Sequence, residues 1–150
     1  PLKNKLVDDF LVMNGDVLTG LDFSEFLEFH KETGSIATIA LNRRHVDIDF
    51  GVVELDENRT LIGYIEKPKI DYLVSMGVYA FNESILEYIP SHEYLDIPDL
   101  MKRLLSEGEK VNGFIHDGYW LDIGRPDDYI KANEDIQKIY RELGVSIDET

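Results

Sequence analysis

The stretch LVMNGDVLT, residues 11–19, joins a run of apolar residues to a turn that ends in a carboxylate, Asp16. A strand that is covered on both faces is continuously apolar rather than alternating, so we expect a buried parallel strand at Phe10 to Met13. In open α/β sheets, ligands bind beside the carboxyl ends of such strands. Asp16 is therefore a candidate ligand-binding residue, with an ordinary Asn-Gly-Asp turn as the alternative.

Helical and strand patterns alternate along the rest of the chain. Asp22 and Glu25 have the spacing of a helix-capping box, and apolar residues then recur at helical spacing up to Gly34. A strand over residues 35–41 follows, so the order strand, helix, strand predicts a right-handed βαβ unit. Other strands are expected at 50–55 and 61–66, as a hairpin, and at 72–81, 111–115 and 120–123. Other helices are expected at 83–89, from Asp96 to Gly108, and from Pro126 onward.

The helix that begins at Asp96 carries its apolar residues on one side, namely Leu100, Met101, Leu104 and Leu105. No internal repeat, low-complexity tract or linker interrupts the pattern. We therefore predict one α/β domain over residues 1–150, built on a mixed sheet.

Composition excludes several classes of partner. The 15 basic and 30 acidic residues give a formal net charge of -15, which repels nucleic-acid backbones and anionic lipid surfaces. No apolar stretch approaches the roughly 18 residues of a membrane span. The absence of cysteine excludes disulfides and thiolate metal sites, and it fits a reducing compartment. We expect a cytoplasmic protein that binds neither nucleic acid nor membrane.

The first residues of the sequence indicate that this chain is part of a longer protein. Pro1 is followed almost at once by the predicted strand at Phe10 to Met13, which needs neighbours in its sheet. We expect these neighbours upstream, in a longer protein, and we expect the exposed strand edge to favour homo-oligomers.

Four short motifs stand out along the chain. They are MNGD (13–16), FGVV (50–53), EKP (66–68) with MGVYAF (76–81), and WLDIGRPDDY (120–129). In this order they resemble those of the sugar-phosphate nucleotidyltransferases, most closely the hexose-1-phosphate guanylyltransferase and glucose-1-phosphate thymidylyltransferase group. The resemblance spans roughly residues 8–136. It implies a Rossmann-like three-layer α/β fold with a mixed, mostly parallel sheet, as in nucleotide-diphospho-sugar transferases.

One signature of that family is not found in these residues. The family carries an N-terminal glycine-rich loop, roughly G-x-G-x-R followed by Pro and Lys, that wraps the nucleoside triphosphate. The resemblance therefore places this chain in the C-terminal part of the catalytic domain, with the N-terminal part missing. We expect these 150 residues alone to be inactive.

The resemblance implies a metal site. In the family, the acid at the position of Asp16 helps to hold Mg²⁺, and an acid of the W-x-D-x-G motif, here Asp122, completes the pair. Mg²⁺ is typically held by one or two carboxylates together with substrate phosphates, which agrees with this role. From the residues alone, Asp122 is better explained as a cap for the helix entry at Gly124 to Pro126.

The resemblance also implies a sugar-phosphate site. Glu66 would bind sugar hydroxyls, and the Lys67 ammonium would bind the sugar phosphate. Gly51 and Gly77 would let the backbone approach the sugar, and Tyr79 would contact it. The alternatives are a solvated ion pair for Glu66 and Lys67, bulge or turn glycines, and a core position for the tyrosine.

The implied reaction joins a sugar 1-phosphate to a nucleoside triphosphate, giving a nucleotide sugar and pyrophosphate, as in a mannose-1-phosphate guanylyltransferase. The nucleophile is already an anionic phosphate oxygen, so the reaction needs Mg²⁺ and cations rather than a general base. The alternatives are a nucleotide-sugar-dependent glycosyltransferase and a non-catalytic regulatory subunit of the same fold. The histidines have no metal-ligand spacing, and we assign them no chemistry: His30, His45, His92 and His116.

Overall fold

The computed structural model of the chain describes residues 8–124, 130 and 140, which divide between two compact units. The first unit comprises Pro1–Asn42 with Ser75–Thr150, and the second comprises Arg43–Val74. That both units belong to one domain stays a prediction. The helix predicted from Pro126 onward lies outside the described residues.

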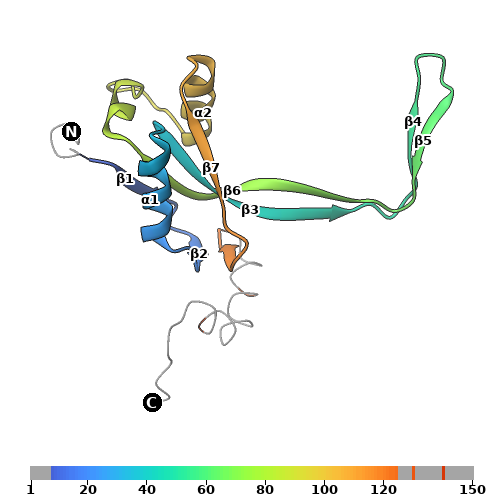
Figure 1. Cartoon of the computed structure of the whole chain (residues 1–150), viewed down its shortest axis with the longest axis horizontal. Coiled ribbons are helices and arrows are strands. Elements are labelled where there is room, and N and C mark those ends of the chain that lie inside the picture. Colours follow the sequence, from blue (N-terminus) through green and yellow to red (C-terminus); the bar gives the residue numbers. More distant parts are fainter. Residues whose placement is uncertain (1–7, 125–129, 131–139, 141–150) are drawn as a thin grey trace. The chain divides into compact units, whose positions relative to one another are not determined.

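A four-stranded sheet with the strand order β1-β6-β3-β7 forms the centre of the first unit (Figure 1). β1 (Phe10–Met13) pairs antiparallel with β6 (Lys69–Phe81). β3 (Ala37–Asp47) pairs parallel with β7 (Val111–Ile115). Parallel and antiparallel pairs therefore occur in one sheet, which confirms the predicted mixed sheet.

Within the described residues, the first strand has one partner, which runs antiparallel to it. β1 pairs with β6 and stands at one end of the strand order, and the parallel neighbours expected upstream stay a prediction. Its residues alternate in burial, and Leu11 and Met13 are 37% and 47% exposed. A run of four apolar residues looks the same in an edge strand as in a covered one, so the sequence pattern could not separate them. The predicted βαβ unit is also altered, because β6 lies between β1 and β3.

Helices cover both faces of this sheet. Successive residues of a strand point to opposite faces, and β6 shows this directly. Val78 belongs to a core cluster with Phe26 of helix α1 (Phe23–Thr33). Tyr79 belongs to a second cluster with Leu104 of helix α2 (Ile97–Ser106). The first unit therefore has the helix, sheet, helix layers that the resemblance implied.

Helix α1 begins and ends as the sequence predicts. The Asp22 carboxylate accepts hydrogen bonds from the backbone N–H groups of Ser24 and Glu25, at 2.8 and 3.1 Å. These bonds satisfy two of the N–H groups that a helix start leaves without partners. Gly34 ends the helix with φ = 57°, a left-handed conformation that glycine adopts without steric cost.

The second helical region agrees with the sequence in part. Asp96 caps α2 by accepting a hydrogen bond from the Asp99 N–H at 2.9 Å. Its apolar side is narrower than predicted, because Leu104 is buried whereas Leu105 is 63% exposed. The helix predicted at 83–89 is a shorter 3₁₀ helix, η2 (Glu83–Glu87).

Two antiparallel strand pairs complete the described structure. β2 (Val17–Thr19) pairs with β8 (Trp120–Asp122) in the first unit. β4 (Val52–Leu55) pairs with β5 (Leu61–Ile65) in the second unit, which confirms the predicted hairpin. None of the helices in the described part of the chain is long and apolar enough to cross a membrane.

Candidate metal and substrate site

The β2–β8 pair brings together two acids that are far apart in the sequence. Asp16 directly precedes β2, and Asp122 ends β8 opposite Val17. The Ile123 N–H donates a hydrogen bond of 2.8 Å to the Asp16 carbonyl, which continues the pairing beyond the strands. Antiparallel pairing therefore holds the two acids beside each other at one end of the ribbon.

The two carboxylates converge over Gly124. A Cβ atom at Gly124 would lie 2.8 Å from Oδ2 of Asp16 and 3.0 Å from Oδ1 of Asp122. Any side chain at this position would therefore displace one or both carboxylates. Both acids are exposed to solvent, so a ligand can reach them.

The two carboxylates are suited to an open Mg²⁺ site. They are too few for a closed structural metal site, in which the protein supplies every ligand. The described residues contain no group of three or more acidic, histidine or cysteine side chains that could hold a metal ion. Mg²⁺ keeps several waters and needs only one or two carboxylates when substrate phosphates supply further oxygens. Asp122 Oδ1 also accepts a hydrogen bond of 2.9 Å from the Gly124 N–H, whereas the helix that Asp122 was expected to cap lies outside the described residues.

Asn14 connects the turn before Asp16 to the neighbouring strand. Its N–H donates to the Gly77 carbonyl at 2.9 Å, and its side chain fills the space beside Gly77, where a Cβ atom would lie 2.7 Å from Nδ2. Gly77 has φ = 74°, a conformation that favours glycine. The structure thus explains the glycine at position 77 by its backbone conformation and by the Asn14 side chain beside it. Sequence reasoning missed Asn14, although it lies within the MNGD motif.

Trp120 fixes the other side of the site. Its indole N–H donates a hydrogen bond of 3.0 Å to the Met76 carbonyl of β6, so β8 is joined to the central sheet beside Gly77. This residue also was not singled out from the sequence. Its place at the start of the WLDIG stretch was the available signal.

Tyr79 lies in the core and not on the surface. It is 7% exposed, and its ring stacks on Phe81 with the ring centroids 6.0 Å apart. Its hydroxyl is 3.0 Å from the Ser75 hydroxyl. We therefore leave Tyr79 out of the sugar site proposed below.

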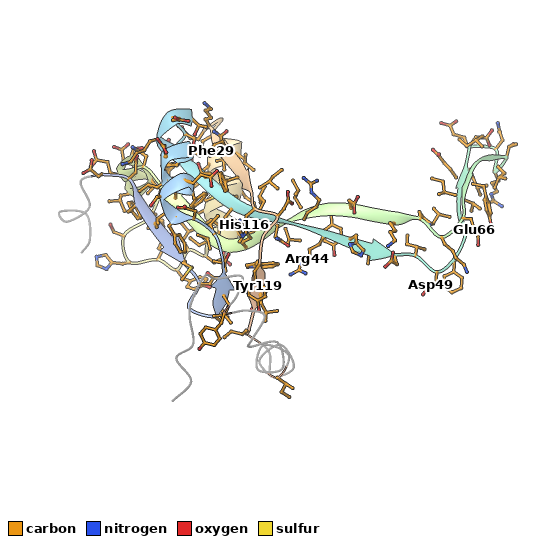
Figure 2. The ribbon with its side chains drawn as sticks, turned by 60° about the horizontal axis from the view of Figure 1, so that its bottom comes forward. Phe29, Arg44, Asp49, Glu66, His116 and Tyr119 are labelled. Atoms are coloured by element: carbon orange, nitrogen blue, oxygen red, sulfur yellow. The ribbon has the colours of Figure 1, made fainter. Side chains whose placement is uncertain are left out.

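The other predicted sugar-binding residues belong to the second unit. Glu66 follows β5 (Figure 2), and its Oε2 accepts a hydrogen bond of 2.7 Å from the Tyr64 hydroxyl. This bond raises the pKa of Tyr64 above its ordinary value. The Tyr64 ring also occupies the space beside Gly51, where no side chain would fit. Lys67 is exposed and has φ = 44°.

Comparison with known proteins gives a consistent result. A family model described as nucleotidyl transferase matches residues 2–139. The chain is 31% identical over 134 residues to the mannose-1-phosphate guanylyltransferase of Mycobacterium tuberculosis, covering 86% of this chain and 37% of that protein. It is 36% identical over 134 residues to a putative mannose-1-phosphate guanyltransferase of Sulfolobus acidocaldarius, covering 87% of this chain and 36% of that protein. The chain therefore spans about a third of the length of these relatives.

Solved structures share the fold. HddC from Yersinia pseudotuberculosis superposes with a TM-score of 0.60 at 25% identity, over 90% of this chain and 59% of that one. A putative glucose-1-phosphate thymidylyltransferase from Bacillus anthracis superposes with a TM-score of 0.65 at 21% identity, over 99% of this chain and 60% of that one. These likenesses confirm the Rossmann-like α/β fold class.

Proposed function

This chain belongs to the nucleotidyl transferase family, and we propose that the complete protein joins a sugar 1-phosphate to a nucleoside triphosphate and releases pyrophosphate. The observation that carries the proposal is the convergence of the Asp16 and Asp122 carboxylates over a glycine, Gly124. Relatives that carry the name mannose-1-phosphate guanylyltransferase support mannose 1-phosphate and GTP as the substrates.

Asp16 and Asp122 would hold Mg²⁺ through the oxygens that face Gly124. An Mg²⁺ ion held there would supply positive charge to neutralise the reacting phosphates. The sugar phosphate is an anionic nucleophile already, so no side chain has to remove a proton from it. The acids therefore act by position and charge, and the absence of a side chain at Gly124 leaves room for the ion.

Glu66 and Lys67, which belong to the second unit, would recognise the sugar phosphate. The Tyr64 hydroxyl orients the Glu66 carboxylate, which leaves its other oxygen available to sugar hydroxyls. Lys67 carries an exposed ammonium group that suits a phosphate oxygen. The left-handed backbone at Lys67 sets the direction of this side chain after the strand ends.

The metal assignment is tested by Asp16→Asn and Asp122→Asn in the complete protein, with formation of the nucleotide sugar measured as a function of Mg²⁺ concentration. Each variant should lose activity by a factor on the order of 10² or more, because the Mg²⁺ that neutralises the reacting phosphates would lose one of its two carboxylate ligands. Asp99→Asn makes the same charge change on an exposed acid of α2 and should retain activity. Near-normal turnover in either site variant would overturn the assignment.

The sugar-phosphate assignment is tested by Lys67→Ala. This variant should raise the KM for the sugar phosphate far more than the KM for the nucleotide. Lys69→Ala is the matched control, since Lys69 lies two residues away and its ammonium pairs with Asp47 at 3.3 Å. Equal changes in both KM values would show that Lys67 does not bind the sugar phosphate.

A further inference from the structure

A polar cavity of about 330 Å³ lies in the first unit, at the opposite end of β1 from Asp16. Asp9, which precedes β1, and His30, in the last turn of α1, both line it. Its wall also includes Lys31, Ser35, Asn82 and Lys110. None of the residues assigned to the metal or the sugar phosphate lines this cavity.

A chain of hydroxyl groups determines which nitrogen of His30 carries the proton. The Thr33 hydroxyl donates to the His30 carbonyl at 2.9 Å, so it must accept from Ser35, 3.0 Å away. The single hydroxyl hydrogen of Ser35 is then used, so Ser35 must accept from Thr38 at 3.1 Å. Thr38 in turn has no hydrogen left for His30, whose Nδ1 lies 2.7 Å from the Thr38 oxygen. His30 must therefore donate from Nδ1–H.

This proton arrangement leaves His30 Nε2 as a bare acceptor. His30 is 1% exposed, and burial is the main reason why its pKa lies below the ordinary value, with Lys31 adding to the decrease and Asp9 opposing it. The ring is therefore neutral near pH 7. Nε2 faces the Asp9 carboxylate across 3.8 Å, and this carboxylate also accepts a hydrogen bond of 2.9 Å from Asn82 Nδ2.

Two acceptors thus face each other at the cavity with no donor between them among the described residues. The carboxyl end of α1, which carries partial negative charge, lies beside them. The Lys110 ammonium donates a hydrogen bond to the Thr33 carbonyl. Lys31 also lines the cavity, but no hydrogen bond within the described residues joins it to His30 Nε2 or to the Asp9 carboxylate. Glu109, also at the cavity, adds a second acid whose Oε1 accepts from the Tyr88 hydroxyl at 2.6 Å.

We propose that this cavity binds a small ligand with a primary ammonium group, which donates one hydrogen bond to His30 Nε2 and another to the Asp9 carboxylate. An ammonium ion supplies both the positive charge and the several N–H donors that the two acceptors lack. A quaternary ammonium ion supplies the charge but no donor. The site is independent of the nucleotidyl transfer proposed above.

The proposal is tested on the protein labelled with ¹⁵N-histidine, with the imidazole nitrogens of His30 observed by long-range ¹H–¹⁵N spectroscopy at neutral pH. Without ligand, His30 should show the Nδ1–H tautomer. Methylammonium chloride, added up to about 0.1 M, should cause a saturable shift of the Nε2 resonance. Tetramethylammonium chloride at equal ionic strength should cause none.

Variants separate this site from general salt effects. Asp9→Asn should weaken methylammonium binding by about tenfold or more, because it removes the charged acceptor. Asp8→Asn, one residue away and not at the cavity, should bind as the unmodified protein does. Three results would overturn the proposal. They are equal responses to the two cations, the absence of a saturable shift because the cavity holds only water, and an Nε2–H tautomer of His30. The comparison of the two cations needs no variant, so it decides the matter even if Asp9→Asn fails to fold.

Discussion

At the scale of single residues, the backbone conformation of Gly77 and its contact with Asn14 both require a glycine. Its φ of 74° is costly for other residues, and the Asn14 side chain fills the place that a Cβ atom would take. Asn14 in turn begins the turn that carries Asp16. A glycine inside a strand is therefore required here by packing beside the candidate site.

We predict that Gly77→Ala lowers the free energy of unfolding by roughly 3 kcal/mol, since it combines backbone strain with a clash. Gly108→Ala is the matched control, because Gly108 has φ = 79° but open space where its Cβ atom would lie, with no described residue beyond its chain neighbours within 4 Å. Gly108→Ala should lower the free energy of unfolding by about 1 kcal/mol, because it introduces backbone strain without a clash. Urea unfolding of both variants gives the comparison, and equal losses would show that Asn14 does not constrain Gly77.

His30 makes stability depend on pH in a predictable direction. Its pKa in the folded chain lies below the ordinary 6.5, so between these two values the unfolded chain binds more protons than the folded one. The contribution of His30 is therefore complete above pH 6.5 and is lost as the pH falls through the folded pKa. We predict that the free energy of unfolding decreases between about pH 7.5 and pH 5.5 more steeply in the unmodified protein than in His30→Gln. Parallel pH profiles from urea unfolding would contradict this.

At the scale of elements, local signals predict helix ends better than strand environments. The cap of α1 depends on one side chain and on backbone N–H groups two and three residues away, so it can be predicted from adjacent residues. The antiparallel pairing of β1 depends instead on β6, more than 60 residues later in the chain. Local patterns therefore could not identify this neighbour of β1.

We predict that Asp22→Ala destabilises the protein by about 1 kcal/mol, because two N–H groups at the start of α1 lose their acceptor. Asp22→Asn keeps an acceptor oxygen and should have a much smaller effect. Thermal or urea unfolding of the two variants distinguishes the cap from the charge. Equal destabilisation by both would mean that charge, not the hydrogen bonds, is the source of the effect.

At the scale of the whole molecule, the second unit exposes most of its large apolar side chains. A two-stranded hairpin is at best marginally stable by itself, and contiguous exposed apolar surface marks a site of interaction. The exposed large apolar side chains of this unit are Val46, Phe50, Val52, Val53, Leu55, Leu61, Ile62, Tyr64, Ile65, Ile70, Tyr72 and Leu73.

We therefore predict that these 150 residues self-associate, in keeping with the homo-oligomer expected from the sequence. Sedimentation velocity should show a weight-average coefficient that rises with concentration. The double variant Ile62→Lys with Ile65→Lys, at positions 60% and 61% exposed, should reduce this rise. Leu105→Lys, at a position 63% exposed on α2, should not. A monomer at every concentration would contradict the prediction.

The sequence by itself determined what depends on neighbouring residues and on recognisable motifs. The caps at Asp22 and Asp96, the hairpin of β4 and β5, the α/β class and the family all follow from local patterns. The motifs also pointed to Asp16 and Asp122 before any geometry was known. Short-range hydrogen bonds and turn conformations are encoded within a few residues, so such features can be read directly.

Only the tertiary structure decided how distant segments meet. The position of Asp16 beside Asp122 depends on the pairing of β2 with β8, and the burial of Tyr79 depends on α2. The same holds for Asn14 beside Gly77. It also holds for His30, whose Nδ1 contacts Thr38 of β3 and whose Nε2 faces Asp9, before β1. These contacts join residues separated by turns, helices and whole strands. Their formation depends on packing of the complete core, which no local pattern specifies.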